Sequence, residues 1–258
     1  MAGARPRALV APIVEPLAAT GAALLELVLA GGCAGCPDGG SALLCIDCRD
    51  ALRGPARLAW PTPVPPGLPA PWAVTAYDGP ARAALLAHKE DGRLALAGPL
   101  GDLLARAVTA ALGGASTGGW NTCGDPAVGL VPVPSRRAAV RARGHDPTLR
   151  LARRAATTVR RAGGHVEAVP VVRVARGLAD QAGLDARQRA ANLDGALAVP
   201  DRLARLVRGR TVVVVDDVIT TGASVNETAR VLRGAGADVV AAAVIAATRR
   251  RLPPGLCL

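Results

Sequence analysis

The stretch that decides the fold is Val212–Ser224, which reads VVVVDDVITTGAS. Its four consecutive valines predict a strand buried on both faces of a parallel sheet, because such strands carry continuous β-branched apolar runs. Two carboxylates, Asp216 and Asp217, follow at the expected carboxyl end of that strand. Open α/β sheets bind their ligands at this edge. The stretch therefore predicts an α/β fold with a ligand site beside the acid pair.

The residues after the strand predict a phosphate-binding turn. Thr220, Thr221, Gly222, Ala223 and Ser224 offer hydroxyls and backbone N–H groups, and we expect a helix to begin near Ser224. Carboxylates repel a phosphate, so the combination favours a ligand with neutral hydroxyls beside its phosphate, such as a ribose 5-phosphate. The alternative is a core strand that ends in a solvated Asp pair and an ordinary helix cap.

This stretch resembles the signature of the type I phosphoribosyltransferases in its apolar run, its acid pair and its Thr-Thr-Gly-x-Ser turn. The resemblance implies that Asp216 and Asp217 hold the ribose hydroxyls of phosphoribosyl pyrophosphate (PRPP). It also implies that the turn 220–224 wraps the 5-phosphate and that Mg²⁺ bridges pyrophosphate and ribose oxygens.

The composition favours one large domain, or one domain with a small module, and supplies ample apolar residues for a core: 50% of 258 residues. The net charge of +11 comes almost entirely from arginine. This charge is consistent with a nucleic-acid or anionic ligand, and equally with a solvated arginine-rich surface. The scarcity of aromatic residues (three Trp, one Tyr and no Phe) disfavours binding of single strands by base stacking.

Lys89 is the only lysine in a chain that uses arginine elsewhere. The presence of one lysine indicates a site that needs a compact ammonium group. The alternative is that this lysine is present by chance.

The N-terminal region predicts no membrane insertion and a cytoplasmic protein. Residues 8–30 are apolar, but Glu15 and Glu26 interrupt them. Two early arginines, an apolar stretch and small residues before Cys33 also resemble a lipoprotein signal. Glu26 and the cysteine spacing that follows argue against that alternative.

Two C-x-x-C pairs predict a structural Zn²⁺ site, because each places two thiolates on one tight turn. Disulfides and a redox-active pair are the alternatives, and a cytosolic enzyme motif downstream favours reduced thiols. We expect the two remaining cysteines, Cys123 and Cys257, to be free thiols. The predicted zinc ligands are Cys33, Cys36, Cys45 and Cys48.

Composition divides the chain into three parts. Residues 1–60 are expected to hold an N-terminal helix and a small zinc-ribbon-like module, residues 61–71 an extended proline-rich linker, and residues 72–258 a phosphoribosyltransferase-like domain. Within the last part, strands alternate with helices, which predicts a doubly wound, mainly parallel sheet. The expected strands are 72–77, 128–133, one within 166–175, 211–215 and 239–247; the expected helices are 81–87, 99–112, 149–161 and 226–234.

Three further segments, in order, resemble the ComF family of phosphoribosyltransferase-like proteins linked to DNA uptake. They are Tyr77-Asp78-Gly79 continuing to His88-Lys89, then Val131–Pro134 followed by Arg141 and Arg143, and then Gln181 to Gly195. The resemblance implies DNA and a DNA-uptake helicase as partners. The chain departs from the family at residues 143–147, where Arg-Gly-His-Asp-Pro replaces Arg-Gly-Phe-Asn-Gln.

The departure of pyrophosphate needs cations, and the predicted catalytic set is Asp216, Asp217, Lys89 and Arg143. Each of the other candidate residues has a non-catalytic alternative: Arg141 and Arg189 as surface cations, His88 and His145 as residues without a catalytic role, Gln181 and Asn192 as helix caps.

The sequence is compatible with three functions: an enzyme that transfers phosphoribosyl to an unidentified acceptor, a PRPP sensor that binds DNA, and an accessory subunit with a vestigial site. The sequence specifies neither the acceptor nor the oligomeric state.

Overall fold

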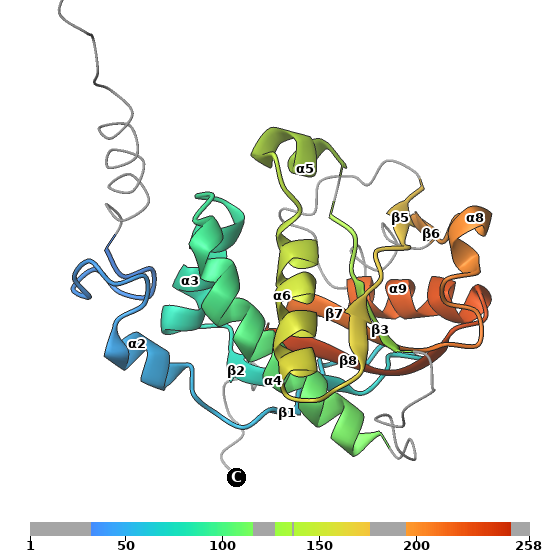
Figure 1. The fold of residues 1–258 in the computed structure, drawn as a ribbon, viewed down its shortest axis with the longest axis horizontal. Coiled ribbons are helices and arrows are strands. Elements are labelled where there is room, and N and C mark those ends of the chain that lie inside the picture. Colours follow the sequence, from blue (N-terminus) through green and yellow to red (C-terminus); the bar gives the residue numbers. More distant parts are fainter. Residues whose placement is uncertain (1–31, 116–126, 136, 176–194, 249–258) are drawn as a thin grey trace, which may run out of the picture.

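A six-stranded, mainly parallel sheet forms the centre of the computed structural model, which describes residues 32–115, 127–135, 137–175 and 195–248 (Figure 1). The strand order is β1-β2-β8-β7-β3-β4, and only β1 is antiparallel to its neighbour. A separate two-stranded antiparallel sheet pairs β5 with β6. The strands are β1 Arg57–Leu58, β2 Pro71–Ala76, β3 Val128–Pro132, β4 Val166–Ala168, β5 Arg173–Val174, β6 Leu197–Ala198, β7 Thr211–Ile219 and β8 Asp238–Ala247.

Helices cover both faces of the central sheet, as the alternation of strands and helices predicts. Helices α3, α4 and α6 pack with Val213 and Val215 on one face, whereas α9 packs with Val212 and Val214 on the other. The described helices are α2 Ile46–Ala51, α3 Gly79–Lys89, α4 Ala97–Gly114, α5 Arg137–Arg143, α6 Pro147–Arg161, α8 Asp201–Ala204 and α9 Ala223–Gly234, with a 3-10 turn at Leu94–Leu96. The α/β, mainly parallel fold is therefore confirmed.

Strand β7 lies inside the sheet, between β8 and β3. Its valines at 212–215 have no solvent exposure, which explains why the run is apolar on both faces. The strand is longer than expected: it continues through the acid pair to Ile219, and Asp216 pairs with Val244 of β8 in the sheet register. The prediction that the strand ends at residue 215 is wrong, because Val218 and Ile219 continue the pairing.

Several other boundaries differ from expectation by a few residues. The strand expected within 166–175 is two short strands, β4 and β5, which belong to different sheets. Helix α9 begins at Ala223, one residue before the start expected near Ser224 and three before the expected helical range 226–234. Helix α5 was not among the expected helices, because its arginine-rich sequence has no apolar periodicity.

One helix among the described residues, Leu94–Gly114 with its 3-10 turn, is long and apolar enough to cross a membrane by length and composition. Leu100, Leu104 and Val108 of α4 have no solvent exposure and belong to the core beneath α3 and α6. The apolar character of this helix is thus explained by burial within the fold.

The proline-rich segment 61–71, which composition predicts as an extended linker, packs against α9. Leu68 is buried, and the side chains of Asn226 and Arg233 donate hydrogen bonds to the carbonyls of Pro66 and Gly67. The Thr62–Pro63 peptide bond is cis. This segment therefore lies against the helix that follows the acid pair.

Candidate functional site

The acid pair lies near the carboxyl edge of the sheet, with its two side chains on opposite faces. Side chains alternate along a strand, so Asp217 shares the α3 face with Val215, and Asp216 shares the α9 face with Val214. Asp216 Oδ1 accepts a hydrogen bond from Asp217 N at 2.8 Å, and Asp217 Oδ1 accepts one from Val218 N at 2.8 Å. Each carboxylate is thus oriented by the backbone that follows it.

Lys89, at the end of α3, is brought to the acid pair. Its Nζ lies 3.0 Å from Asp217 Oδ2, with side-chain exposures of 38% for Lys89 and 11% for Asp217. Burial alone would lower the pKa of Lys89, but the negative charges of Asp217 and Asp216 outweigh it and raise this pKa. The ammonium therefore stays charged beside the carboxylates.

The pKa of Asp216 is raised as well, which for a carboxyl group favours the neutral form. Burial raises the pKa of Asp216 well above its ordinary value, and the charge of Asp217 raises it further. The ammonium of Lys89 opposes both effects without overcoming them. Among the described residues, Asp217 has a direct cationic partner in Lys89 and Asp216 has none, so the two carboxyls are unequal.

The turn after β7 presents unpaired N–H groups at the start of α9. Gly222 is the N-cap and has a left-handed backbone with φ of 76°. Ala223 N donates to Thr221 Oγ1 at 3.4 Å. Within the described part of the chain, the N–H groups of Thr220, Gly222 and Ser224 donate to no acceptor. Thr220 is exposed and Ser224 is half-buried. The turn is therefore able to bind an anion through its backbone.

Arg143 lies near Lys89, but its guanidinium is already bound. Its Nη2 donates to both carboxylate oxygens of Glu90, at 2.7 and 2.9 Å. Glu90 adjoins Lys89, so this ion pair holds the end of α3 against the end of α5. Sequence reasoning missed Glu90; its position next to the lone lysine was the available signal.

A pair of histidines packs in the same corner. The rings of His88 and His145 are 6.1 Å apart, and the Nε2 atoms of both are buried without a hydrogen-bond partner among the described residues. Each Nδ1 contacts a backbone carbonyl, that of Arg93 or Arg143. Burial lowers the pKa of His88, and its contacts with carbonyl oxygens oppose this only in part. His88 is therefore stabilised as the neutral imidazole.

A cavity of about 560 Å³ adjoins the carboxyl end of β3, the strand next to β7. Pro132 pairs with Val215 in the sheet, so the cavity opens at the same edge as the acid pair. Arg141 and Arg153 line it and have no ionic partner within the described ranges. Arg173 also lines it, with its guanidinium donating to the carbonyls of Pro170 and Val172. Asp146, whose Oδ1 caps α6, is the carboxylate among the lining residues, so the three arginines leave the cavity with a net positive lining.

Some predicted residues lie outside the described ranges. These residues are Gln181, Arg189, Asn192, Cys123 and Cys257.

The four N-terminal cysteines form a second candidate site. Their sulfur atoms all lie within 4.8 Å of one another, and the cysteines are Cys33, Cys36, Cys45 and Cys48. All four are free thiols. Cys36 Sγ and Cys45 Sγ are 3.7 Å apart, close to the roughly 3.8 Å edge of a tetrahedral ZnS₄ group with 2.3 Å bonds. The cluster therefore has a geometry that suits zinc and not a disulfide.

Backbone N–H groups point at the sulfurs, as they do in metal-binding knuckles. Cys33 Sγ accepts hydrogen bonds from Cys45 N at 3.2 Å and from Gly35 N at 3.3 Å. Burial alone would raise the pKa of Cys33. These two hydrogen bonds and a further one from the backbone of Cys36 outweigh burial and lower the pKa to about 6. The surroundings of Cys33 therefore favour its thiolate, which is the form that binds metal, whereas burial and the neighbouring sulfurs raise the pKa values of Cys36 and Cys48.

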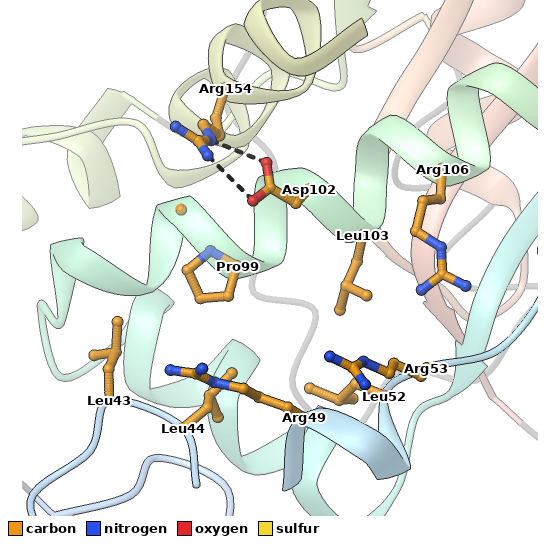
Figure 2. Close-up of a pocket in the computed structure, with 11 residues that line it drawn as sticks. Leu43, Leu44, Arg49, Leu52, Arg53, Pro99, Asp102, Leu103, Arg106 and Arg154 are labelled. Carbon is orange, nitrogen blue, oxygen red and sulfur yellow. Dashed lines mark hydrogen bonds and ion pairs between the residues drawn. The ribbon is translucent and has the colours of Figure 1, made fainter. Parts of the chain in front are cut away.

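A second cavity, of about 460 Å³, lies between α2 of the cysteine module and α4 (Figure 2). Leu43, Leu44 and Leu52, which flank α2, line it together with Leu103 of α4. Arg154 of α6 binds Asp102 there at 3.0 and 3.1 Å. None of the residues predicted to bind PRPP lines this cavity.

Comparison with known proteins bears on the carboxyl half of the chain. Residues 150–254 match the family model described as "Phosphoribosyl transferase domain". The chain is also 52% identical over 44 residues to "Orotate phosphoribosyltransferase 2" of Mesorhizobium japonicum (strain LMG 29417 / CECT 9101 / MAFF 303099). This similarity covers 17% of the chain and 23% of that protein. The matched region 150–254 includes β7, the acid pair, the turn and α9.

Proposed function

We propose that this protein binds PRPP at the carboxyl edge of its sheet and transfers the phosphoribosyl group to an acceptor. The observation that carries the proposal is the arrangement after β7: two carboxylates, then a turn with unpaired N–H groups at a helix N-terminus. Asp216 and Asp217 would accept hydrogen bonds from the ribose hydroxyls, and the turn 220–224 would hold the 5-phosphate. The family match over residues 150–254 supports this interpretation.

Transfer would form a bond from an acceptor nitrogen to carbon-1 of the ribose. The bond between carbon-1 and the pyrophosphate oxygen breaks, pyrophosphate leaves with the electron pair, and the acceptor releases a proton to solvent. Negative charge develops on the leaving group, so cations near it lower the barrier. Arg141 and Arg153 line the cationic cavity beside β3 and supply that charge. Arg143 would contribute only after leaving Glu90.

The donor set also fits the two metals that the resemblance implies. Asp216 and Asp217 offer hard carboxylate oxygens of the kind Mg²⁺ prefers, and the ion would offset the charge of pyrophosphate. The four cysteines would hold a structural Zn²⁺, since their sulfur spacing matches a tetrahedral site. We extend the proposal to membership of the ComF family, which the order of the sequence motifs supports, and hence to a role in DNA uptake.

Two measurements on the full chain test this function. Calorimetry with PRPP and Mg²⁺ should give saturable binding that Asp217→Asn weakens at least tenfold; equal affinity of the two proteins would reject the site. Pyrophosphate release is then followed with a panel of nitrogen acceptors that includes orotate and the common nucleobases. Binding without release on any acceptor would favour a PRPP sensor over a transferase.

A further inference from the structure

The proline-rich segment 61–71 supports the turn that follows β7. Leu68 is only 8% exposed and belongs to the same buried apolar cluster as Ile219 and Val225, the residues that flank the turn. A Cβ atom built on Gly222 would lie 3.2 Å from Leu68 Cδ2 and 3.2 Å from Pro61 Cγ. The two side chains therefore contact the backbone of the turn at its left-handed residue.

Two hydrogen bonds from α9 fasten this segment in place. Asn226 Nδ2 donates to the carbonyl of Pro66 at 3.2 Å, and Arg233 Nη1 donates to the carbonyl of Gly67 at 2.7 Å. Gly67 has φ of 83°, so the segment turns there into Leu68. Backbone carbonyls, side-chain amide and guanidinium together hold Leu68 beneath the turn.

The turn itself has few internal restraints. Besides the hydrogen bonds inside α9, to which Ala223 and Ser224 belong, the turn's hydrogen bonds among the described residues are Ala223 N to Thr221 Oγ1 at 3.4 Å and Asn226 N to the carbonyl of Gly222 at 2.8 Å. The N–H groups that would face a phosphate are unpaired, so hydrogen bonds within the protein do not fix their directions. Apolar contact from below is a further restraint beside the start of α9, and a preorganised site binds its ligand with a smaller loss of entropy.

We propose that Leu68 and Pro61 are positioning residues for phosphate binding: they hold the turn 220–224 in the conformation that presents its N–H groups. This inference rests on the proposed function, since the ligand is the 5-phosphate. It assigns to the segment that connects β1 with β2 a part in substrate affinity that its composition did not indicate.

The test compares full-length wild type with Leu68→Ala, using ribose 5-phosphate as the probe in calorimetry. Leu68→Ala should raise Kd about 3- to 10-fold, the equivalent of one weakened hydrogen bond. Hydrogen exchange of a peptide that spans 219–226 should also become faster. Leu68→Met fills a similar volume and should restore both values. Unchanged Kd and unchanged exchange in Leu68→Ala would overturn the proposal.

A matched control separates positioning from general loss of stability. Leu112→Ala removes the same atoms from the core on the other face, where Leu112 is 1% exposed. It should lower Tm without changing Kd or the hydrogen exchange of residues 219–226. An equal change of Kd in both variants would contradict the positioning role of Leu68.

Leu68→Val replaces Leu68→Ala if the latter does not fold. If wild type fails to bind ribose 5-phosphate, the proposed function fails, and the exchange data alone still decide whether Leu68 holds the turn.

Discussion

Lys89 Nζ and Asp217 Oδ2 lie 3.0 Å apart, although 128 residues separate them in the chain. The only lysine of the protein thus meets one carboxylate of its acid pair. The pair is partly shielded from water, and the neighbouring Asp216 adds to the attraction on the ammonium. This ion pair joins α3 to β7 and is the first target for experiment.

Replacing Lys89 should cost stability because it leaves Asp217 without its cation. We expect Lys89→Met to lower the free energy of unfolding by about 1–2 kcal/mol, since the ammonium is still partly exposed. Lys89→Arg, which retains the charge, should cost less. In urea unfolding, the double variant Lys89→Met/Asp217→Asn should be less destabilised than the sum of the single changes. Strict additivity would show that the two side chains do not interact.

Asp216→Asn should stabilise the ligand-free protein while weakening ribose phosphate binding. The pKa of Asp216 is raised in the folded state above its ordinary value of 3.8, so its ionisation at pH 7 favours unfolding. This penalty grows as pH rises through the folded pKa and is absent below pH 3.8. We expect Tm to rise by about 2–4 °C at pH 7. Thermal scans should show this gain shrinking toward pH 4.

The exposed Asp238 at the start of β8 is the control for that experiment. Asp238→Asn should leave Tm nearly unchanged at both pH values. A gain for Asp216→Asn that persisted at low pH would contradict the assigned cause.

Gly222→Ala should damage the turn in two ways. The left-handed φ of 76° disfavours any L side chain, and the new methyl group would press on Leu68 and Pro61 at 3.2 Å. We expect a loss of about 1–3 kcal/mol in the free energy of unfolding and weaker ribose 5-phosphate binding. Gly234→Ala, at the end of the same helix with open space around it, is the control and should be neutral or stabilising. Equal effects of the two changes would refute this account.

Stability should fall as the solution becomes acidic because of His88. Its pKa is lowered in the folded state by burial, with His145 and Arg150 nearby adding positive charge. The unfolded chain therefore binds a proton more readily, and stability is lost as pH falls from about 6.5 toward the folded pKa. His88→Leu should flatten this part of the pH profile in urea titrations. The exposed His165 serves as the control, since His165→Gln should preserve the wild-type slope.

Zinc should be present at one ion per chain and should depend on the cysteine cluster. Cys36→Ser should abolish it and lower Tm, because a structural zinc contributes folding energy directly. Cys123→Ser should retain the metal. Atomic emission on the purified full chain gives both stoichiometries, and zinc retained in Cys36→Ser would exclude the cluster as a four-cysteine site.

The valine run and the strand–helix alternation predicted the sheet correctly, because burial on both faces leaves a strong composition signal. The end of β7 was harder to predict: two carboxylates looked like the end of a strand, yet neighbours in β8 carry the pairing on to Ile219. Contacts between distant segments had no local signal. The position of Glu90 beside the lone lysine marked it as a candidate site residue but did not predict its ion pair with Arg143. Proline content alone did not indicate that Leu68 is buried beneath Gly222.

The burial of Leu68 also bears on how the protein is shortened for laboratory work. A fragment that starts at Trp72 follows the change in composition, but it would lack β1, which pairs with β2, and the residues that contact Gly222. Such a fragment would expose Ile219 and Val225 to water. It would also leave β2 as an unpaired edge strand, because β1 is missing. Low solubility of that fragment would then reflect the chosen cut, and a starting point ahead of Gly54 would preserve these contacts.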